Sequence, residues 1–171
     1  MKFLYIFLTI IFFSILNLFA EETRQVDKHE HGVGELNIAI DSNIMNFEFM
    51  LPGADIVGFE YKAQSEEDVA LVNNALAKFE DFNNIFIIPK DGLCQLSSSE
   101  VAINQQGQHN EFQAEYSFEC KDIKIINKII FPYFSTFENS GELEIQFISE
   151  IGSSSFKVQR NRPFINTKGK I

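Results

Sequence analysis

The sequence predicts an α+β domain built on a mainly antiparallel β-sheet, with two helices in the order ββα-ββα-ββ and one disulfide. The observations behind it are runs of alternating apolar and polar residues, a stretch with helical spacing, and two cysteines. Alternation with a period of two indicates strands with one buried face, and a period of 3.6 indicates an amphipathic helix. Local hairpins with interspersed helices are typical of the α+β class.

The first hairpin is expected between residues 34 and 51. Apolar residues alternate with polar or small ones over residues 36–40 and again over 45–51, and the polar triplet Asp41-Ser42-Asn43 separates the two runs. Two such runs joined by a short turn predict a β-hairpin with one buried face. Pro52-Gly53 should end its second strand.

A helix should follow an irregular connection over residues 55–62. Ser65 and Asp68 have a spacing close to that of a capping box, and the first turn is acidic, as the helix dipole favours. Apolar residues then recur at helical spacing as far as Phe79, so the helix should end near Glu80.

The rest of the chain predicts a second, less regular set of elements. Residues 81–93 should form a short helical turn and a loop around Pro89. The remaining expected elements are strands over 96–103 and 112–120 joined by a polar loop over 104–110, a helix over 122–130, and strands over 142–149 and 154–159.

Cys94 and Cys120 are predicted to form a disulfide. Antiparallel pairing of the two middle strands brings the two residues together. The bridge would close a loop of about 27 residues and stabilise the fold by about 3.5 kcal/mol in the chain-entropy model. Two buried thiols are the alternative, whereas a redox-active pair is disfavoured because no Cys-x-x-Cys spacing is present.

Residues 1–20 are predicted to be a cleavable signal peptide. Lys2 precedes an uncharged apolar run that ends at Ala20, and a polar stretch begins at Glu21. The alternative is an uncleaved transmembrane anchor, since the run is near the lower length limit for spanning a bilayer. Cleavage would leave no stable membrane anchor, a mobile lead-in over 21–33, one domain over 34–165 and a tail over 166–171.

The mature chain would be strongly acidic. Removal of residues 1–20 leaves 13 basic and 24 acidic residues, a formal charge of −11. Such a surface is repelled by nucleic acid and by anionic lipid. The 19 phenylalanines are best explained as core residues, although Phe59 with Tyr61, and residues 131–134, would alternatively line a groove.

Histidine provides the candidate metal ligands. His29 and His31 would point the same way in an extended segment, and zinc accepts imidazole and carboxylate ligands in a tetrahedral set. His109 and Glu60 are candidate further ligands. The alternative is that these histidines are simply solvated. No nucleophile elbow, zinc-protease motif, phosphate loop or dinucleotide fingerprint is present, so we expect no enzyme activity.

Three segments resemble the ZrgA-type family of zinc uptake proteins. The segment over 29–41, which reads HEHGVGELNIAID, is similar to the family's opening. PGADIVGFE over 52–60 is similar to its Pro-x-x-x-hydrophobic-x-Gly-Phe-Glu motif, and Cys94 and EYSFEC over 115–120 fit its two cysteines. The resemblance covers essentially the whole mature chain. It implies a non-enzymatic periplasmic protein of Gram-negative bacteria that binds zinc under zinc limitation and assists an ABC importer.

Two departures from the family pattern remove ligands. The histidine-rich loop that the family carries is reduced here to His109, and Tyr61 stands where the family tends to have histidine. The resemblance therefore implies His29, His31 and His109 as metal ligands, with Glu60 as a fourth. The second hypothesis is a metal-free envelope module that docks a transporter or membrane partner through Phe59 and Tyr61.

Overall fold

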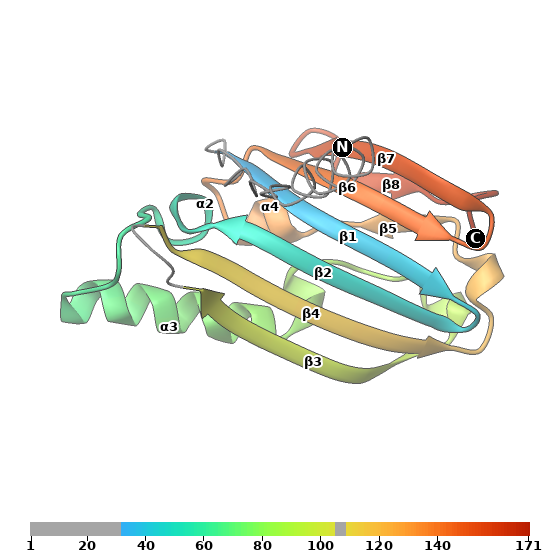
Figure 1. The fold of residues 1–171 in the computed structure, drawn as a ribbon, viewed down its shortest axis with the longest axis horizontal. Coiled ribbons are helices and arrows are strands. Elements are labelled where there is room, and N and C mark those ends of the chain that lie inside the picture. Colours follow the sequence, from blue (N-terminus) through green and yellow to red (C-terminus); the bar gives the residue numbers. More distant parts are fainter. Residues whose placement is uncertain (1–31, 105–108) are drawn as a thin grey trace, which may run out of the picture.

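A six-stranded β-sheet forms the centre of the structure, a computed structural model that describes residues 32–104 and 109–171 (Figure 1). Its strand order is β3-β4-β2-β1-β6-β7. The six strands are β1 (Val33–Asp41), β2 (Ile44–Pro52), β3 (Cys94–Asn104), β4 (Glu111–Cys120), β6 (Glu142–Ser149) and β7 (Gly152–Gln159). The predicted signal peptide, His29 and His31 lie outside the described residues.

The sheet is antiparallel at every pairing except one. The hairpins β1–β2, β3–β4 and β6–β7 pair locally, and β2 pairs antiparallel with β4. β1 and β6 are parallel, with Val33 opposite Glu142 and Ala39 opposite Ile148. The prediction of a mainly antiparallel sheet is therefore confirmed, and the parallel pair is a feature that local sequence patterns do not contain.

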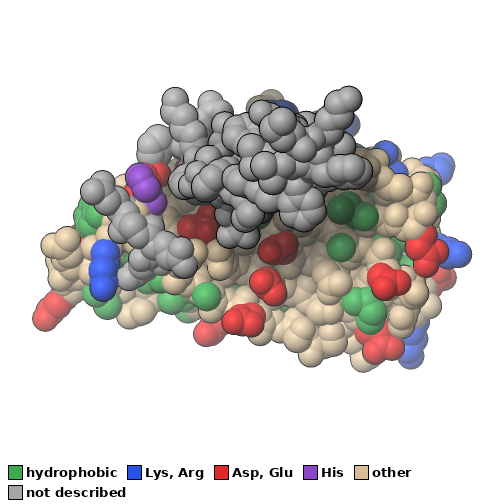
Figure 2. All heavy atoms as spheres, viewed as in Figure 1, with side chains coloured by type: hydrophobic (Ala, Val, Ile, Leu, Met, Phe, Trp, Pro, Cys, Tyr) green, Lys and Arg blue, Asp and Glu red, His purple; other side chains and the backbone are tan. Residues whose placement is uncertain are grey.

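One face of the sheet is apolar and buried, as the alternation predicts. Successive side chains of a strand point to opposite faces, so every second residue of the central strands enters the core. The inward residues include Leu36, Ile38, Phe47, Phe49, Leu51, Phe112, Tyr116, Phe118, Leu143, Ile145 and Phe147. The opposite face carries polar and acidic side chains (Figure 2).

Helix α3 (Glu66–Glu80) covers part of the buried face and begins as predicted. The Ser65 side chain accepts from the Asp68 backbone N–H, and the Asp68 carboxylate accepts from the Ser65 N–H, completing a capping box. Backbone hydrogen bonds from Ser65 and Gln64 hold the pKa of Asp68 below its usual value. The Phe79 ring stacks on Phe112, so the helix is attached to β4.

The count of helices differs from the prediction. The described chain also has α2 (Gly53–Val57), inside the connection expected to be irregular, and α4 (Tyr133–Thr136), neither of which was predicted. Residues 81–93 hold two 3-10 turns, η1 (Phe82–Asn84) and η2 (Lys90–Gly92). Helices of four or five residues are too short to show a helical period. None of the described helices is long and apolar enough to cross a membrane.

The helix predicted over residues 122–130 is wrong. This stretch forms the 3-10 turn η3 (Ile123–Ile125) and strand β5 (Lys128–Ile130). β5 pairs antiparallel with β8 (Phe164–Asn166), with Ile129 opposite Ile165. Paired isoleucines fit both a helical and an extended pattern, and β-branched side chains favour strands once a partner strand is present. That partner lies more than thirty residues along the chain.

Phenylalanines fill the core beneath the sheet. Phe86 stacks on Phe47 at 4.1 Å between ring centroids and meets the edges of Tyr116 and Phe118. The Tyr116 hydroxyl donates to the Phe79 carbonyl at 2.6 Å, which satisfies it inside the core. Residues 131, 133 and 134 are buried, so this cluster belongs to the core and lines no groove.

The predicted disulfide is present. Cys94 and Cys120 lie directly opposite each other at the end of the β3–β4 ladder, and their sulfur atoms are 2.05 Å apart. The described residues contain no free cysteine. The bridge therefore joins the edge strand β3 to its neighbour β4 at the end of the hairpin that is farthest from the connecting loop.

We expect reduction, or the Cys94→Ser/Cys120→Ser double variant, to lower the free energy of unfolding by about 3.5 kcal/mol, because the bridge restricts the unfolded chain. Urea unfolding of the oxidised and reduced protein, followed by circular dichroism, measures the difference. The Ser97→Ala/Ser117→Ala variant on the same two strands serves as the control. An unchanged unfolding midpoint after reduction would contradict the stabilising role.

Candidate metal centre

The ends of four strands lie at the same end of the sheet and bring separate segments of the chain together. β2 ends at Pro52, which is opposite Glu111 at the start of β4, and Glu111 is also opposite Asn104 at the end of β3. β1 begins at Val33 at the same end of its pairing with β2. The segments that join these strands therefore share one end of the molecule.

The chain turns sharply after β2 to place residues 59–61 beside the start of β4. Gly58 caps the C-terminus of helix α2. Its φ of 87° is a left-handed conformation suited to glycine, and its N–H donates to the Ala54 carbonyl at 3.1 Å. The aromatic pair Phe59 and Tyr61 stack with ring centroids 4.6 Å apart. Glu60 lies between them in sequence and faces the segment before β4.

Asn110 holds these segments together. Only 3% of its surface is exposed. Its backbone N–H donates to the Glu60 carbonyl at 2.6 Å, its side-chain amide donates to the Tyr61 carbonyl, and its own carbonyl accepts from the Gly53 N–H at 2.8 Å. Asn110, a buried residue next to His109 in the chain, thus holds the segment that carries Glu60 in place.

The result is a direct contact between two predicted ligand residues. His109 Nδ1 lies 2.8 Å from Glu60 Oε2, although the residues are 49 positions apart. The histidine side chain is 66% exposed and the glutamate side chain 20% exposed. Glu60 is therefore packed against the protein surface, whereas the imidazole extends into solvent.

This contact has a clear chemical consequence. In the tautomer with the proton on Nδ1, His109 donates to the carboxylate and its Nε2 carries a free lone pair. A carboxylate that accepts from one imidazole nitrogen orients the ring and raises the basicity of the other nitrogen, which is the common arrangement around metal-bound histidine. The pair can therefore present one oriented metal ligand to solvent.

Tyr61 directly follows Glu60 in the chain. Its side chain is 50% exposed. Partial desolvation, followed by the charge of Asp68, raises the pKa of its phenol, so the hydroxyl remains protonated and lies 3.4 Å from the Asp68 carboxylate. The aromatic patch proposed from the sequence, Phe59 and Tyr61, therefore flanks Glu60 along the chain and is partly open to solvent.

Gly32, where the described chain begins, is anchored near the same end. Its N–H donates to Asp55 Oδ1 at 2.8 Å, and its carbonyl accepts from the N–H groups of Gly141 and Glu142 at 3.0 and 2.7 Å. Asp55 is 2% exposed and belongs to α2. His29 and His31 directly precede this anchored residue in sequence and lie outside the described residues.

The buried surroundings of Asp55 support this anchor. Ser140 Oγ lies 2.8 Å from the Tyr133 hydroxyl and 3.4 Å from the Asp55 carbonyl. Burial raises the pKa of the Tyr133 phenol, which stays neutral. The anchor is therefore a hydrogen-bonded group enclosed by the core, and it orders α2 together with the start of β1.

The described residues do not contain a complete zinc site. Within residues 32–104 and 109–171, no group of three or more His, Cys, Asp or Glu side chains could hold a metal ion. A tetrahedral site needs about four ligands, and the His109–Glu60 pair offers at most two. The pair fits zinc by ligand type but is incomplete in number without further residues.

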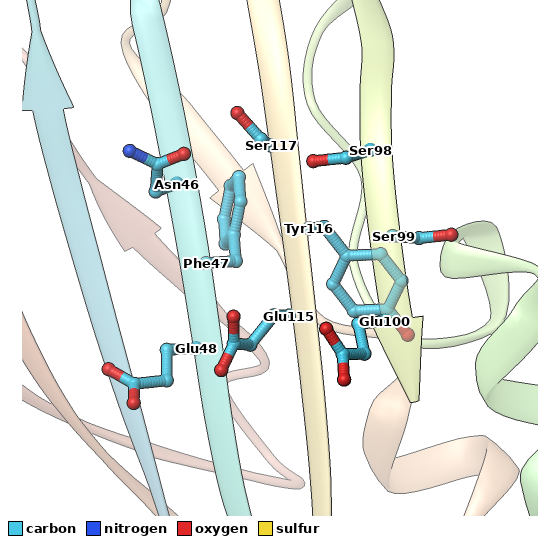
Figure 3. A pocket seen from close by; sticks show the side chains of 9 residues that line it. All are labelled: Asn46, Phe47, Glu48, Ser98, Ser99, Glu100, Glu115, Tyr116 and Ser117. Atoms are coloured by element: carbon cyan, nitrogen blue, oxygen red, sulfur yellow. The ribbon is translucent and has the colours of Figure 1, made fainter. Parts of the chain in front are cut away.

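A second acidic feature lies on the outer face of the sheet. Glu100, Glu115 and Glu48 are opposite one another across β3, β4 and β2, and they line a shallow hollow of about 570 Å³ (Figure 3). Like charges directly opposite repel each other. This row attracts cations in general, but in the described structure it has no geometry that would hold one.

Sequence reasoning missed Asp55 and Asn110, which organise this end. Asp55 stands within the segment that resembles the family motif, but its hydrogen bond to Gly32 spans 23 positions. Asn110 reads as one of several polar loop residues. The sequence around a polar residue at the junction of a loop and a strand does not indicate that its side chain is buried. Only the tertiary contacts show that Asn110 is buried and bonded.

We expect Gly53→Ala to disturb the His109–Glu60 pair. A Cβ at this position would lie 2.7 Å from the Phe59 carbonyl oxygen and 2.9 Å from the Asn110 carbonyl oxygen, so the backbone would have to move. We expect a loss of about 1–3 kcal/mol of stability. Heteronuclear NMR should show shifts at His109 and Glu60. Ala54→Gly at the next position controls for helix propensity, and unchanged His109 signals would refute the constraint.

Comparison with known proteins supports the family resemblance of the sequence. A search of curated proteins found no match. Residues 28–167 match the profile of the ZrgA family zinc uptake proteins, so the match extends over most of the chain and includes all four predicted ligand positions. The chain belongs to the ZrgA family of zinc uptake proteins.

Proposed function

We propose that this protein is a periplasmic zinc-binding accessory that assists zinc uptake, or buffers zinc, when zinc is scarce. Its zinc-related role follows from family membership. The observation that carries the finer proposal is the 2.8 Å contact between His109 and Glu60, because it prepares an exposed imidazole for a metal ion. In this proposal zinc is cargo, held and then released.

The anchored start of β1 supports a role for His29 and His31 in the same site. Gly32 is bound to Asp55 in α2, and α2 leads through Gly58 to Glu60. His31 directly precedes Gly32 in the sequence. We propose that His29 and His31 supply the ligands that the His109–Glu60 pair lacks.

The compartment and the partner are part of the proposal. The apolar run over residues 1–20 supports export, and a disulfide supports an oxidising environment. An ABC-type zinc importer would be the acceptor of the metal. We propose no enzymatic activity, because zinc binding and transfer account for the exposed pair without a reaction step.

Zinc titration by calorimetry of the mature, oxidised protein at pH 7.4 tests the proposal. We expect saturable binding at micromolar concentration or tighter, at least tenfold weaker in both His109→Ala and His29→Ala/His31→Ala. Binding should also weaken in mildly acidic solution, because protonated imidazole has no lone pair for a metal. Asn139→Ala, at an exposed position, serves as the control.

Each outcome of that titration has a definite meaning. Loss of binding in both histidine variants, with the control unchanged, would support one site built from both segments. Loss in the His29→Ala/His31→Ala variant alone would exclude His109 as a ligand. Absence of binding in the unaltered protein would refute the proposed function.

The role of Glu60 can be separated from that of a direct ligand. If Glu60 orients His109, Glu60→Gln should bind zinc within about threefold of the unaltered protein, because the amide oxygen still accepts from Nδ1–H. Glu60→Ala should then bind about 10–100-fold more weakly. Equal, large losses in both variants would instead identify Glu60 as a ligand. Glu111→Gln, at the start of β4, controls for the loss of one negative charge.

The exposed Tyr61 ring supports a second candidate function. It stacks on Phe59 and is half exposed, as an aromatic residue at a partner contact would be. In this alternative the protein is a metal-free module that docks a transporter or membrane partner through the aromatic pair. Failure of zinc binding in the titration above would leave this candidate as the leading one.

A further inference from the structure

We propose that the outer face of the β5–β8 hairpin binds an acidic segment of a protein partner. Its residues are Asn127, Lys128, Arg162, Phe164, Asn166 and Lys168, here called the basic face. In Figure 1, β5 and β8 lie side by side behind the large sheet, and their pairing is antiparallel. This surface is separate from the candidate metal centre, and the inference does not depend on zinc binding.

The fold brings two basic segments together in an acidic protein. From residue 151 onward the chain has five basic residues and no acidic one, whereas the whole chain has a formal charge of −10. Residues 121–128 hold three lysines and a single aspartate. Pairing of Lys128 with Asn166 unites these segments, and the local concentration of positive charge is therefore a product of tertiary structure.

Other cations of the C-terminal segment already have partners. Lys157 Nζ lies 3.0 Å from Glu142 Oε1 and 2.5 Å from Glu144 Oε1. Arg160 donates to main-chain carbonyls after α4, including that of Glu138 at 2.8 Å. Lys170 donates to Ser154 Oγ at 2.8 Å. These three side chains therefore already have partners within the protein.

Lys128, Arg162 and Lys168 differ from them. None of the three forms an ion pair with another residue in the described part of the chain. Lys128 Nζ lies 4.1 Å from the centre of the Phe164 ring, and the Arg162 guanidinium lies 5.4 Å from it. Both cations therefore lie near one aromatic ring and have no acidic partner among the described residues, an arrangement that an anion would complete.

The surface beside Lys128 and Lys168 is concave. Asn127, Lys128, Phe164, Asn166 and Lys168 line a hollow of about 240 Å³. This volume is below the roughly 300–1,000 Å³ of typical small-molecule sites and is large enough for a side chain. The two amides and two ammonium groups can donate hydrogen bonds to the carboxylate of a glutamate or aspartate. The aromatic ring can contact the methylene groups of the same side chain.

An acidic peptide fits these features better than an anionic membrane. Membrane attraction by basic residues relies on clusters of about four to eight Lys or Arg, and this face has three. The net charge of −10 would repel a negative bilayer as a whole. A short acidic segment can instead contact the three cations while avoiding the acidic outer face of the large sheet.

The basic face and the candidate metal centre can be tested separately. Ser149 Oγ donates to the Lys170 carbonyl at 2.6 Å, so the segment after β8 reaches the end of β6 opposite to Glu142 and Gly32. Changes at Lys128 and Lys168 should consequently leave zinc affinity unaltered. Failure of zinc binding would not argue against peptide binding at the basic face, and failure of peptide binding would not argue against zinc binding.

The test uses a fluorescein-labelled hexaglutamate peptide and fluorescence anisotropy on the mature, oxidised protein at 50 mM salt. We expect saturable binding that weakens at least fivefold in Lys128→Gln/Lys168→Gln and at 200 mM salt. The control is Lys90→Gln/Lys121→Gln, which removes the same charge from exposed positions and should change the affinity less than twofold. Thermal unfolding confirms that both variants are folded.

Two results would overturn the proposal. Absence of hexaglutamate binding, or equal weakening in the control variant, would show that the basic face is not a specific site. Binding to vesicles containing 30% phosphatidylglycerol, in the absence of peptide binding, would identify a membrane contact instead. Peptide binding lost only in the Lys128→Gln/Lys168→Gln variant would establish the surface.

Discussion

The parallel pairing of β1 with β6 is the constraint on which the rest of the structure depends. Seven residue pairs, from Val33–Glu142 to Ala39–Ile148, join a sheet made of β3, β4, β2 and β1 to the hairpin of β6 and β7. Without it the apolar faces of the two parts would not form one continuous core. The same pairing sets residues 141 and 142 against Gly32, so it also positions this residue, which directly precedes β1.

Two buried polar residues connect the sheet to the exposed His109 side chain. Asp55 and Asn110 are almost fully buried. The hydrogen bond of Asp55 links α2 to Gly32, and those of Asn110 hold the segment over 59–61 next to His109. A buried polar group is costly unless its hydrogen bonds are satisfied, so these contacts tolerate little displacement. The imidazole they support is open to solvent, which suits the proposed binding and release of zinc.

Much of the fold could be predicted from local pattern. Alternation located all six strands of the large sheet, and the capping box at Ser65 located the start of α3. The prediction failed over residues 122–130, because Ile129 becomes part of a strand only through its pairing with Ile165. It also missed α2 and α4, which lie in connections whose conformation depends on the elements around them.

The sequence by itself determined the residue types available for chemistry, the disulfide partners and the family, because these depend on composition, spacing and motif. Only the tertiary structure decided that His109 and Glu60 touch, and that Lys128 and Lys168 face one hollow. These pairs are separated by 49 and 40 positions. Contacts of this kind arise from strand order and buried hydrogen bonds, and neither follows from the pattern of neighbouring residues.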